Sequence, residues 1–195
     1  MGGTFDPIHI GHLMIAEEAK LQFDLDEVVF IPAGSPWQKV QVSDPEDRYM
    51  MTLLGTLDNL GFSVSRIDID RGGPTYTLDT LNQLNEFYAG SADLYFITGT
   101  DTLRELFTWK EPEKVLQAAR FVTATRPGFA LEDLGPLTKK VSLMNAPLVD
   151  VSSTDIRRRV SEGLAYRYLV PERVALYIAA RGLYSGDHAR SQADV

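Results

Sequence analysis

The sequence predicts an α/β protein with a doubly wound, Rossmann-like parallel sheet in a three-layer α/β/α arrangement. Short apolar segments with strand character alternate along the 195 residues with segments whose apolar residues recur at helical spacing. Such alternation favours a mainly parallel sheet covered by helices on both faces, and right-handed crossovers make that sheet doubly wound. Ligands of these folds bind at the carboxyl ends of the strands.

The strands are predicted from short apolar runs that turn residues or polar residues interrupt. Residues 27–32 (EVVFIP) end at a Pro that a Gly follows two residues later, and residues 94–98 (LYFIT) form a similar run. The remaining segments expected to be extended or rich in β structure are 62–70, 121–125, 141–143 and 148–151.

The helices are predicted from helical spacing and from start and stop signals. Ser43-Asp44-Pro45-Glu46 combines an early Pro with capping-box spacing, so a helix is expected from there to about Leu60, with Gly61 as its stop. Another helix is expected directly after His12. The other predicted helices cover residues 77–88, 113–119, 154–162 and 172–181.

The ends of the chain carry two further expectations. We expect one domain over residues 1–184 and a disordered polar tail over 185–195. A loop at residues 2–12 has the composition of a phosphate loop, which should follow the first strand, yet the chain begins at Met1-Gly2. We therefore expect a sheet that lacks its usual first strand, because the sequence starts at an internal methionine or is truncated.

Composition excludes several classes of protein. The net charge of −8 argues against a nucleic-acid partner, because polyanion binding needs a basic face. No apolar run approaches the ~20 residues that cross a bilayer, and no secretory signal is present, so no membrane partner is expected. The absence of Cys excludes disulfides and thiolate metal sites and predicts a cytoplasmic protein.

The segment 2–12 (GGTFDPIHIGH) is the most informative part of the sequence. Two histidines three residues apart open a helix, and Gly11 between them lets a nucleotide approach the backbone. A helix N-terminus offers unpaired N–H groups and a partial positive charge to phosphate. The alternatives are a plain turn with a capping histidine, or a metal site, although no third ligand lies nearby in the sequence.

A second candidate phosphate site lies at residues 151–157 (VSSTDIR), where hydroxyl side chains and an arginine open a helix. The alternative is that Ser or Thr only caps that helix. Similar alternatives apply elsewhere. Asp101 can be a helix N-cap, Thr77 can cap the helix that it opens, Trp109 can belong to the core, and Lys39 can be a surface residue.

Together these strings resemble a known family. Residues 2–12 are similar to the GGTFDPxHxGH signature of the nucleotidyltransferase superfamily, in the form most like bacterial nicotinate mononucleotide adenylyltransferases. Residues 151–157 resemble the family's ISSTxIR motif, with Val in place of the first Ile. The resemblance implies catalytic roles for His9, His12 and Arg157. It implies ATP binding by Gly3, Thr4, Phe5, His9, Gly11, His12, Gly99, Asp101, Ser153, Thr154 and Arg157.

The same resemblance implies a site for the second substrate. The Thr75-Tyr76-Thr77 segment would face the nicotinate carboxylate, and Trp109 would stack on the pyridine ring. The segment 35–39 (SPWQK) departs from the family's PPHK at Trp37 and Gln38. The implied substrate-binding residues are Lys39, Arg48, Thr75, Tyr76, Thr77, Trp109 and Arg126.

The implied reaction transfers AMP from ATP to nicotinate mononucleotide, giving nicotinate adenine dinucleotide and pyrophosphate in NAD biosynthesis. Mg²⁺ is expected to arrive with ATP, since the sequence shows no cage of ligands for it. The sequence leaves open a homo-oligomer. It also leaves open another HxGH nucleotidyltransferase, such as a phosphopantetheine adenylyltransferase or a cytidylyltransferase, and a catalytically inactive nucleotide-binding protein.

Overall fold

The computed structural model describes residues 1–37, 41–99, 102–103, 105–124, 140–147 and 149–186. Its strands are β1 (Gly2–Gly3), β2 (Val28–Pro32), β3 (Ser35–Pro36), β4 (Phe62–Val64), β5 (Pro74–Thr75), β6 (Tyr95–Thr98), β7 (Arg120–Ala124) and β8 (Val141–Met144). Its helices are α1 (Ile10–Gln22), α2 (Pro45–Thr56), α3 (Ile67–Arg71), α4 (Thr77–Tyr88), the 3₁₀ helix η1 (Leu106–Thr108), α6 (Pro112–Ala118), α7 (Ser153–Ser161) and α8 (Glu172–Arg181).

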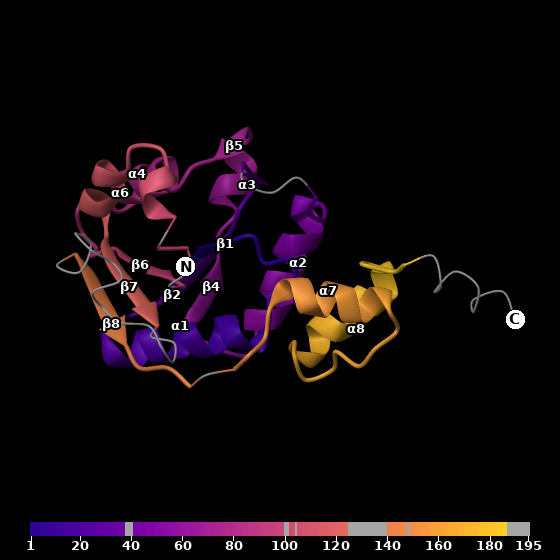
Figure 1. The fold of residues 1–195 in the computed structure, drawn as a ribbon. Helices are drawn as coiled ribbons and strands as arrows, with labels where there is room; N and C mark the ends of the chain where they lie inside the picture. Colours follow the sequence, from indigo (N-terminus) through magenta and orange to yellow (C-terminus); the bar gives the residue numbers. More distant parts are fainter. Residues whose placement is uncertain (38–40, 100–101, 104, 125–139, 148, 187–195) are drawn as a thin grey trace, which may run out of the picture.

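The strands form parallel sheets, as predicted. One sheet has the order β1-β2-β4 and another has the order β6-β7-β8, while β3 and β5 form a small separate pair. β1 lies against β6, so the two larger sheets continue each other side by side (Figure 1). The chain therefore moves outward from β1 in one direction and from β6 in the other. The point between β1 and β6 is the switch point at which ligands of such folds bind.

The expectation that the first strand is missing is wrong in part, because β1 is present as a strand of two residues. Gly2 pairs with Ile31 and Gly3 with Pro32 in parallel register. The N–H of Ala33 also donates to the carbonyl oxygen of Gly3 at 2.9 Å. Two residues of ladder are sufficient to deliver the following loop to the carboxyl end of the sheet.

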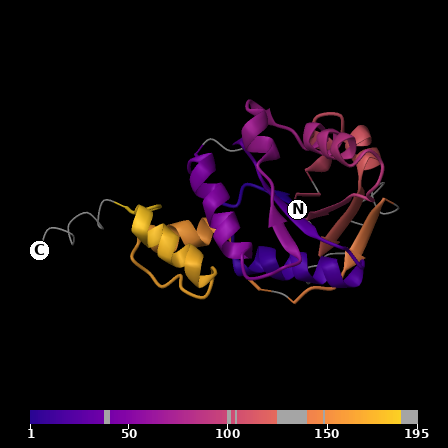
Figure 2. The same cartoon turned by 180° about the vertical axis from the view of Figure 1, so that it is seen from behind.

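The core falls into two clusters on opposite faces of the β6-β7-β8 sheet. Phe121 and Val122 are adjacent on β7, yet they belong to different clusters because successive strand residues face opposite sides. One cluster includes Ala16 and Ala19 of α1, and the other includes Leu78 and Leu81 of α4. Figure 2 shows α1 below the strands and the α4 region above them. The three-layer prediction is thus confirmed.

Most predicted elements are found, and two differ from the prediction. The predicted helices 77–88 and 172–181 coincide with α4 and α8. The β-rich prediction for residues 62–70 fails after Val64, where α3 begins at Ile67. Asp68 of α3 is buried and accepts hydrogen bonds from Arg71 and Thr80, contacts that strand propensity cannot anticipate. The predicted extended piece 148–151 forms no strand over its described residues, 149–151.

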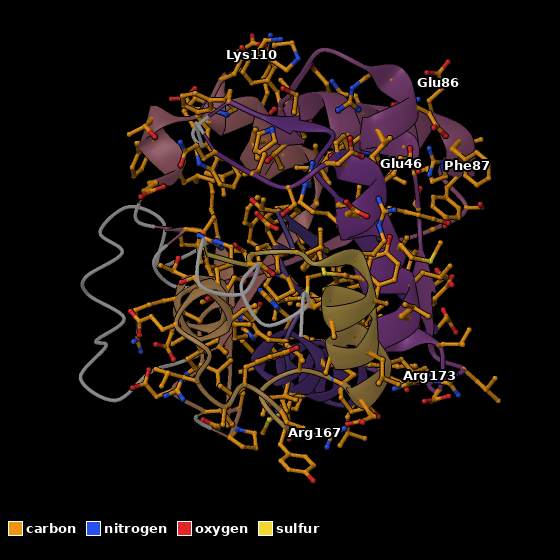
Figure 3. All side chains as sticks on the ribbon, turned by 90° about the vertical axis from the view of Figure 1, so that its right-hand side faces the viewer. Glu46, Glu86, Phe87, Lys110, Arg167 and Arg173 are labelled. Atoms are coloured by element: carbon orange, nitrogen blue, oxygen red, sulfur yellow. The ribbon has the colours of Figure 1, made fainter. Side chains whose placement is uncertain are left out.

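The last helix, α8, packs against α2 rather than extending the sheet layers (Figures 1 and 2). Tyr177 and Arg181 of α8 both donate to Oδ1 of Asp47, at 2.7 and 3.1 Å. Gly182 ends α8 in the left-handed conformation, at φ 61°. Figure 3 shows charged side chains such as Glu86, Lys110 and Arg173 at the periphery. Among the described helices, none has both the length and the apolar character needed to span a membrane.

Candidate active site

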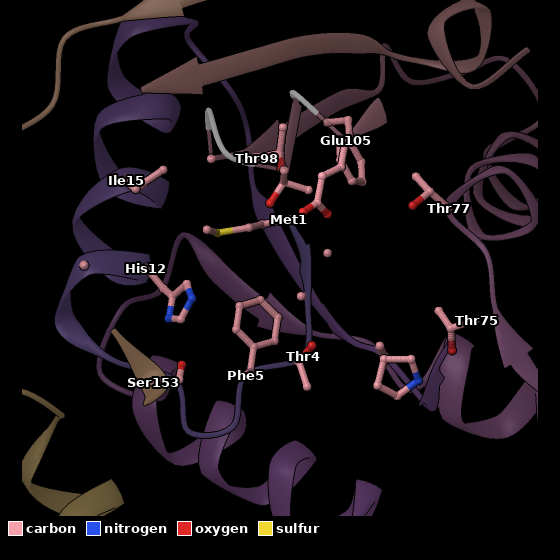
Figure 4. Close-up of a pocket in the computed structure, with 18 of the residues that line it drawn as sticks. Met1, Thr4, Phe5, His12, Ile15, Thr75, Thr77, Thr98, Glu105 and Ser153 are labelled. Atoms are coloured by element: carbon pink, nitrogen blue, oxygen red, sulfur yellow. The ribbon is translucent and has the colours of Figure 1, made fainter. Parts of the chain in front are cut away.

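A cleft of about 530 Å³ opens at the carboxyl ends of the parallel strands. Figure 4 shows Phe5, His12 and Ser153 on one side of this cleft and Thr75 and Thr77 on the other. The structure brings fourteen of the predicted site residues to it. They are Gly3, Thr4, Phe5, His9, Gly11, His12, Thr75, Tyr76, Thr77, Gly99, Trp109, Ser153, Thr154 and Arg157.

The loop after β1 is held tightly around Phe5. Phe5 has φ 49°, a left-handed conformation that is strained for a bulky residue, and its side chain is buried. A Cβ on Gly3 would lie 2.8 Å from the Phe5 ring, so only glycine fits there. The Phe5 ring also meets His12 edge-on, with 5.1 Å between the ring centroids. The loop therefore supports one of the two histidines directly.

The two histidines form a stacked pair at the start of α1. His9 is the N-cap residue, and its ring centroid lies 3.7 Å from that of His12. The backbone N–H of His9 donates to Nδ1 of His12 at 3.2 Å, so the proton of a neutral His12 ring lies on Nε2. Burial lowers the pKa of His9 to about 4, which keeps that ring neutral at pH 7. A Cβ on Gly11 would crowd the His9 ring at 3.1 Å.

The start of α7 is bonded to the same loop. Ser152 is the N-cap residue and accepts from the N–H of Asp155, so capping falls to Ser152 rather than to Ser153 or Thr154. The Ser153 hydroxyl donates to the carbonyl oxygen of Pro7 at 2.9 Å. Nη1 of Arg157 donates to the carbonyl oxygen of Asp6 at 2.7 Å. These contacts place hydroxyl groups and a guanidinium beside the histidine pair.

The other side of the cleft is built mainly from rings. The Tyr76 ring lies 4.7 Å from Nζ of Lys110 and 6.2 Å, between centroids, from the ring of Trp37. Trp109 meets Phe96 edge-on at 6.1 Å and packs against a core cluster while still lining the cleft. Trp109 is therefore in contact with the core and also lines the cleft, and its role as a stacking platform stays a prediction.

Arg48, predicted to bind substrate, does not line the cleft. Its side chain is fully buried, with 0% of the residue exposed. It donates to the backbone carbonyl oxygens of Thr4, Ala33, Gly34 and Ser43. An arginine occupied in this way cannot reach a ligand. These hydrogen bonds instead hold the loop after β1 against the end of β2. The prediction that Arg48 binds substrate is corrected accordingly.

Three other predicted residues, Lys39, Asp101 and Arg126, lie outside the described residues. Conversely, the cleft lining includes several residues that the sequence did not predict as site residues. Among them are Trp37, Phe96, Glu105 and Lys110. Trp37 was visible in the sequence only as a departure from the family pattern. Phe96 lies in a short apolar strand, where nothing in the sequence separates a cleft residue from a core residue.

The described part of the chain contains no group of three His, Asp or Glu side chains that could hold a metal ion. The cleft lining includes two carboxylates, those of Glu105, which is exposed, and of Asp68, which is buried and bonded to Arg71 and Thr80. These two side chains and the histidine pair form no group of three that could serve as a protein cage for a divalent cation.

Comparison with known proteins identifies the family. The sequence profile of the family described as Cytidylyltransferase-like matches residues 1–159. The chain belongs to this family. The cytidylyltransferase-like match includes both motifs of the cleft, the histidine pair and the start of α7.

Relatives of this cytidylyltransferase-like protein carry consistent names. A protein of Streptomyces coelicolor named "Probable nicotinate-nucleotide adenylyltransferase" is 54% identical over 96% of this chain and 100% of its own length. One of Salinispora arenicola with the same name is 52% identical over 94% of this chain and 99% of its own. A solved structure, Plasmodium falciparum nicotinic acid mononucleotide adenylyltransferase complexed with NaAD, has the same fold, with a TM-score of 0.76. It is 21% identical and covers 94% of each chain.

Proposed function

We propose that this protein transfers the adenylyl group of ATP to nicotinate mononucleotide, forming nicotinate adenine dinucleotide and pyrophosphate in NAD biosynthesis. The observation that carries the proposal is that one cleft joins the stacked histidines and the α7 start to the Thr75–Thr77 segment and Trp109. Relatives at more than 50% identity are named for this activity. The cytoplasmic location and the oligomeric state stay predictions.

The reaction requires little covalent chemistry from the protein. An oxygen of the mononucleotide's 5′-phosphate attacks the α-phosphorus of ATP in line. As the new P–O bond forms, the bond from the α-phosphorus to the bridging oxygen breaks, and pyrophosphate leaves with that electron pair. Since the nucleophile is already an anion, the protein's task is to position the two phosphates and stabilise the growing charge.

The phosphate side of the cleft suits that task. Because Nδ1 of His12 accepts from the backbone, its Nε2–H is the donor for an oxygen of the α- or β-phosphate. Thr4, Ser153 and Thr154 add hydroxyl groups to the same side, and Arg157 adds a positive charge for the β- and γ-phosphates. Neutral His9 adds no charge of its own and supports the His12 ring by stacking.

Mg²⁺ enters with ATP in this proposal, bound to the phosphates, where it neutralises part of their charge. The described side chains form no cage for the ion, so in this proposal it has no protein ligand.

The other side of the cleft suits the pyridine nucleotide. Trp109 presents an indole ring that can stack on nicotinate. Thr75 and Thr77 flank the start of α4, whose backbone N–H groups favour a carboxylate. The uncharged amide of nicotinamide would pair poorly with such donors. Contacts from Lys39, Asp101 and Arg126 remain predictions.

Competition between acceptors tests this function. We expect kcat/KM for nicotinate mononucleotide to exceed that for nicotinamide mononucleotide by roughly 10³-fold or more, because a site built around one polar pattern rejects the other. Equal values for the two would refute acid recognition. Turnover with phosphopantetheine, or with CTP and an alcohol phosphate, would support the related nucleotidyltransferases instead. ATP binding without turnover of any acceptor would indicate an inactive nucleotide-binding protein.

A further inference from the structure

A tyrosine from beyond α8 reaches back to the phosphate loop. The hydroxyl of Tyr184 donates to Oδ1 of Asp6 at 2.6 Å, across 178 positions of sequence. Tyr184 follows the left-handed Gly182 that ends α8, so the chain turns back toward the loop at that point. The family profile ends at residue 159, so this contact comes from outside the part that defines the family.

The carboxylate that receives this bond joins three segments of the chain. Asp6 is only 3% exposed, and its Oδ2 accepts from the backbone N–H of Ser43 at 3.1 Å. Its carbonyl oxygen accepts from Arg157, which lines the cleft. Asp6 is itself absent from the cleft lining. The carboxylate of Asp6 therefore acts on the site only through the loop that carries it.

The Tyr184 hydroxyl is a dependable donor to this carboxylate. Burial, together with the hydrogen bond to Asp6, raises the pKa of Tyr184 above its usual range. The phenol therefore stays protonated at neutral pH and remains able to donate. Hydrogen bonds from O–H to a carboxylate are shorter and stronger than those between neutral groups, and 2.6 Å lies in that range.

Backbone strain lies at both ends of this connection. Tyr184 has φ 62° and Phe5, the residue before Asp6, has φ 49°. A bulky residue in the left-handed region is strained and persists only where its surroundings hold it. The hydrogen bond joins Tyr184 to Asp6, the residue next to Phe5. The Phe5 ring in turn contacts the ring of His12.

We propose that Tyr184 is a positioning residue for ATP. Through its bond to Asp6 it holds the Phe5–Pro7 turn, so that the histidine pair and the start of α7 face the same part of the cleft. The proposal rests on the proposed function for the identity of the nucleotide. It makes the segment after α8 part of the phosphate site, although that segment contributes no residue to the cleft lining.

The chain offers a matched control for the test. Tyr177 of α8 also donates its hydroxyl to a buried carboxylate, Asp47, at 2.7 Å. Asp47 lies on α2 and does not line the cleft. Tyr177→Phe and Tyr184→Phe each remove one hydroxyl from the same part of the chain, so a purely structural effect should be similar in both.

The experiment measures the Kd of ATP, with Mg²⁺ present, by titration calorimetry on the wild type and both variants. For Tyr184→Phe we expect Kd to rise roughly tenfold, in line with the strength of hydrogen bonds to charged groups. Tyr177→Phe should stay close to the wild type. The KM of nicotinate mononucleotide should not change in either variant, and both should lose similar amounts of unfolding free energy.

The outcomes separate this proposal from the proposed function. A wild type that binds ATP but makes no dinucleotide refutes the function, while the ATP titration still tests Tyr184. Equal Kd values for the two variants overturn the positioning role. If Tyr184→Phe does not fold, Asp6→Asn is titrated instead. Its neutral amide replaces the charge-assisted bonds from Tyr184 and Ser43 by weaker ones between neutral groups, so ATP binding should weaken, and an unchanged Kd would overturn the proposal.

Discussion

On the side of the cleft proposed to bind phosphates, partly buried hydrogen bonds to the backbone hold the residues in place, whereas on the proposed acceptor side aromatic rings contact one another near the surface. Ser153 and Arg157 donate to the carbonyl oxygens of Pro7 and Asp6, and Arg48 lies fully buried beneath the same loop. Across the cleft, Trp37 is 48% exposed, and its ring centroid lies 6.2 Å from that of Tyr76.

Under the proposed function, this difference between the two sides corresponds to the different substrates that they bind. In-line transfer between phosphates depends on atoms placed to within a fraction of an ångström, which buried polar bonds can secure. Recognition of a flat ring needs surface area and one or two polar contacts, and rings near the surface can adjust to it. The phosphate side should therefore respond to substitutions through stability and kcat, and the acceptor side through KM.

The largest effect on stability is expected from Arg48→Met. This variant leaves the carbonyl oxygens of Thr4, Ala33, Gly34 and Ser43 without their donor, so we expect a loss of ~3–5 kcal/mol in the free energy of unfolding. Urea denaturation measures it. Arg66→Met is the control, since its pairs with Glu46 and Asp70 lie at the surface and should contribute little to stability. Similar losses in both variants would show that the buried bonds of Arg48 do not stabilise the fold.

His12→Ala should give the largest effect on rate. It removes the donor expected at the transferring phosphate, so kcat should fall ~10²–10³-fold while the Kd of ATP changes far less. Steady-state kinetics and an ATP titration measure the two quantities. A kcat within a few-fold of the wild type would place the chemistry elsewhere in the cleft.

The buried His9 predicts a pH dependence of stability. Its pKa falls from 6.5 in the unfolded chain to about 4 in the folded protein because of burial. Between these values the unfolded state binds the proton first, so stability falls as the pH drops from 6.5 to 4, by about 3 kcal/mol. Below pH 4 this residue adds no further loss.

The measurement compares the free energy of unfolding of the wild type and His9→Asn across that pH range. Carboxylates titrate in both proteins, so the difference between the two curves isolates His9. The difference should grow as the pH falls from 6.5 to 4, and a constant difference would show that the folded protein does not disfavour the His9 cation.

Trp109→Ala is expected to have the smallest effect and to be confined to the acceptor side. The KM of nicotinate mononucleotide should rise by the equivalent of ~1–3 kcal/mol, by analogy with the stacking of bases on aromatic side chains. The KM of ATP should stay nearly unchanged. Trp109→Phe should recover most of the loss. A change confined to ATP would put Trp109 on the wrong side of the cleft.

Local patterns in the sequence predicted much of this molecule. The helical spacing of Leu78 and Leu81 predicts α4, and a glycine is the residue expected to end a helix, as Gly182 ends α8. The histidine spacing correctly placed both rings on one face of a helix start. Each of these features depends on residues within a turn or two of one another.

What the sequence did not predict depends on contacts between distant segments. The role of Arg48 requires Thr4, Gly34 and Ser43 to converge around one guanidinium, and an arginine near phosphate motifs looks the same whether it binds ligand or backbone. Asp6 was visible in the signature, but its partner lies 178 positions away. Likewise, Asp68 lies in a segment that was expected to be rich in β structure, but it belongs to α3 and is buried against Thr80.

The bond between Tyr184 and Asp6 also has a consequence for synthesis on the ribosome. The tyrosine that holds the loop after β1 is synthesised 178 positions after Asp6. At about 5–20 residues per second, the loop waits roughly ten to thirty-five seconds for its partner, and closing so long a loop adds an entropic cost. A nascent chain therefore forms its histidine pair before the bond that holds the Phe5–Pro7 turn can exist.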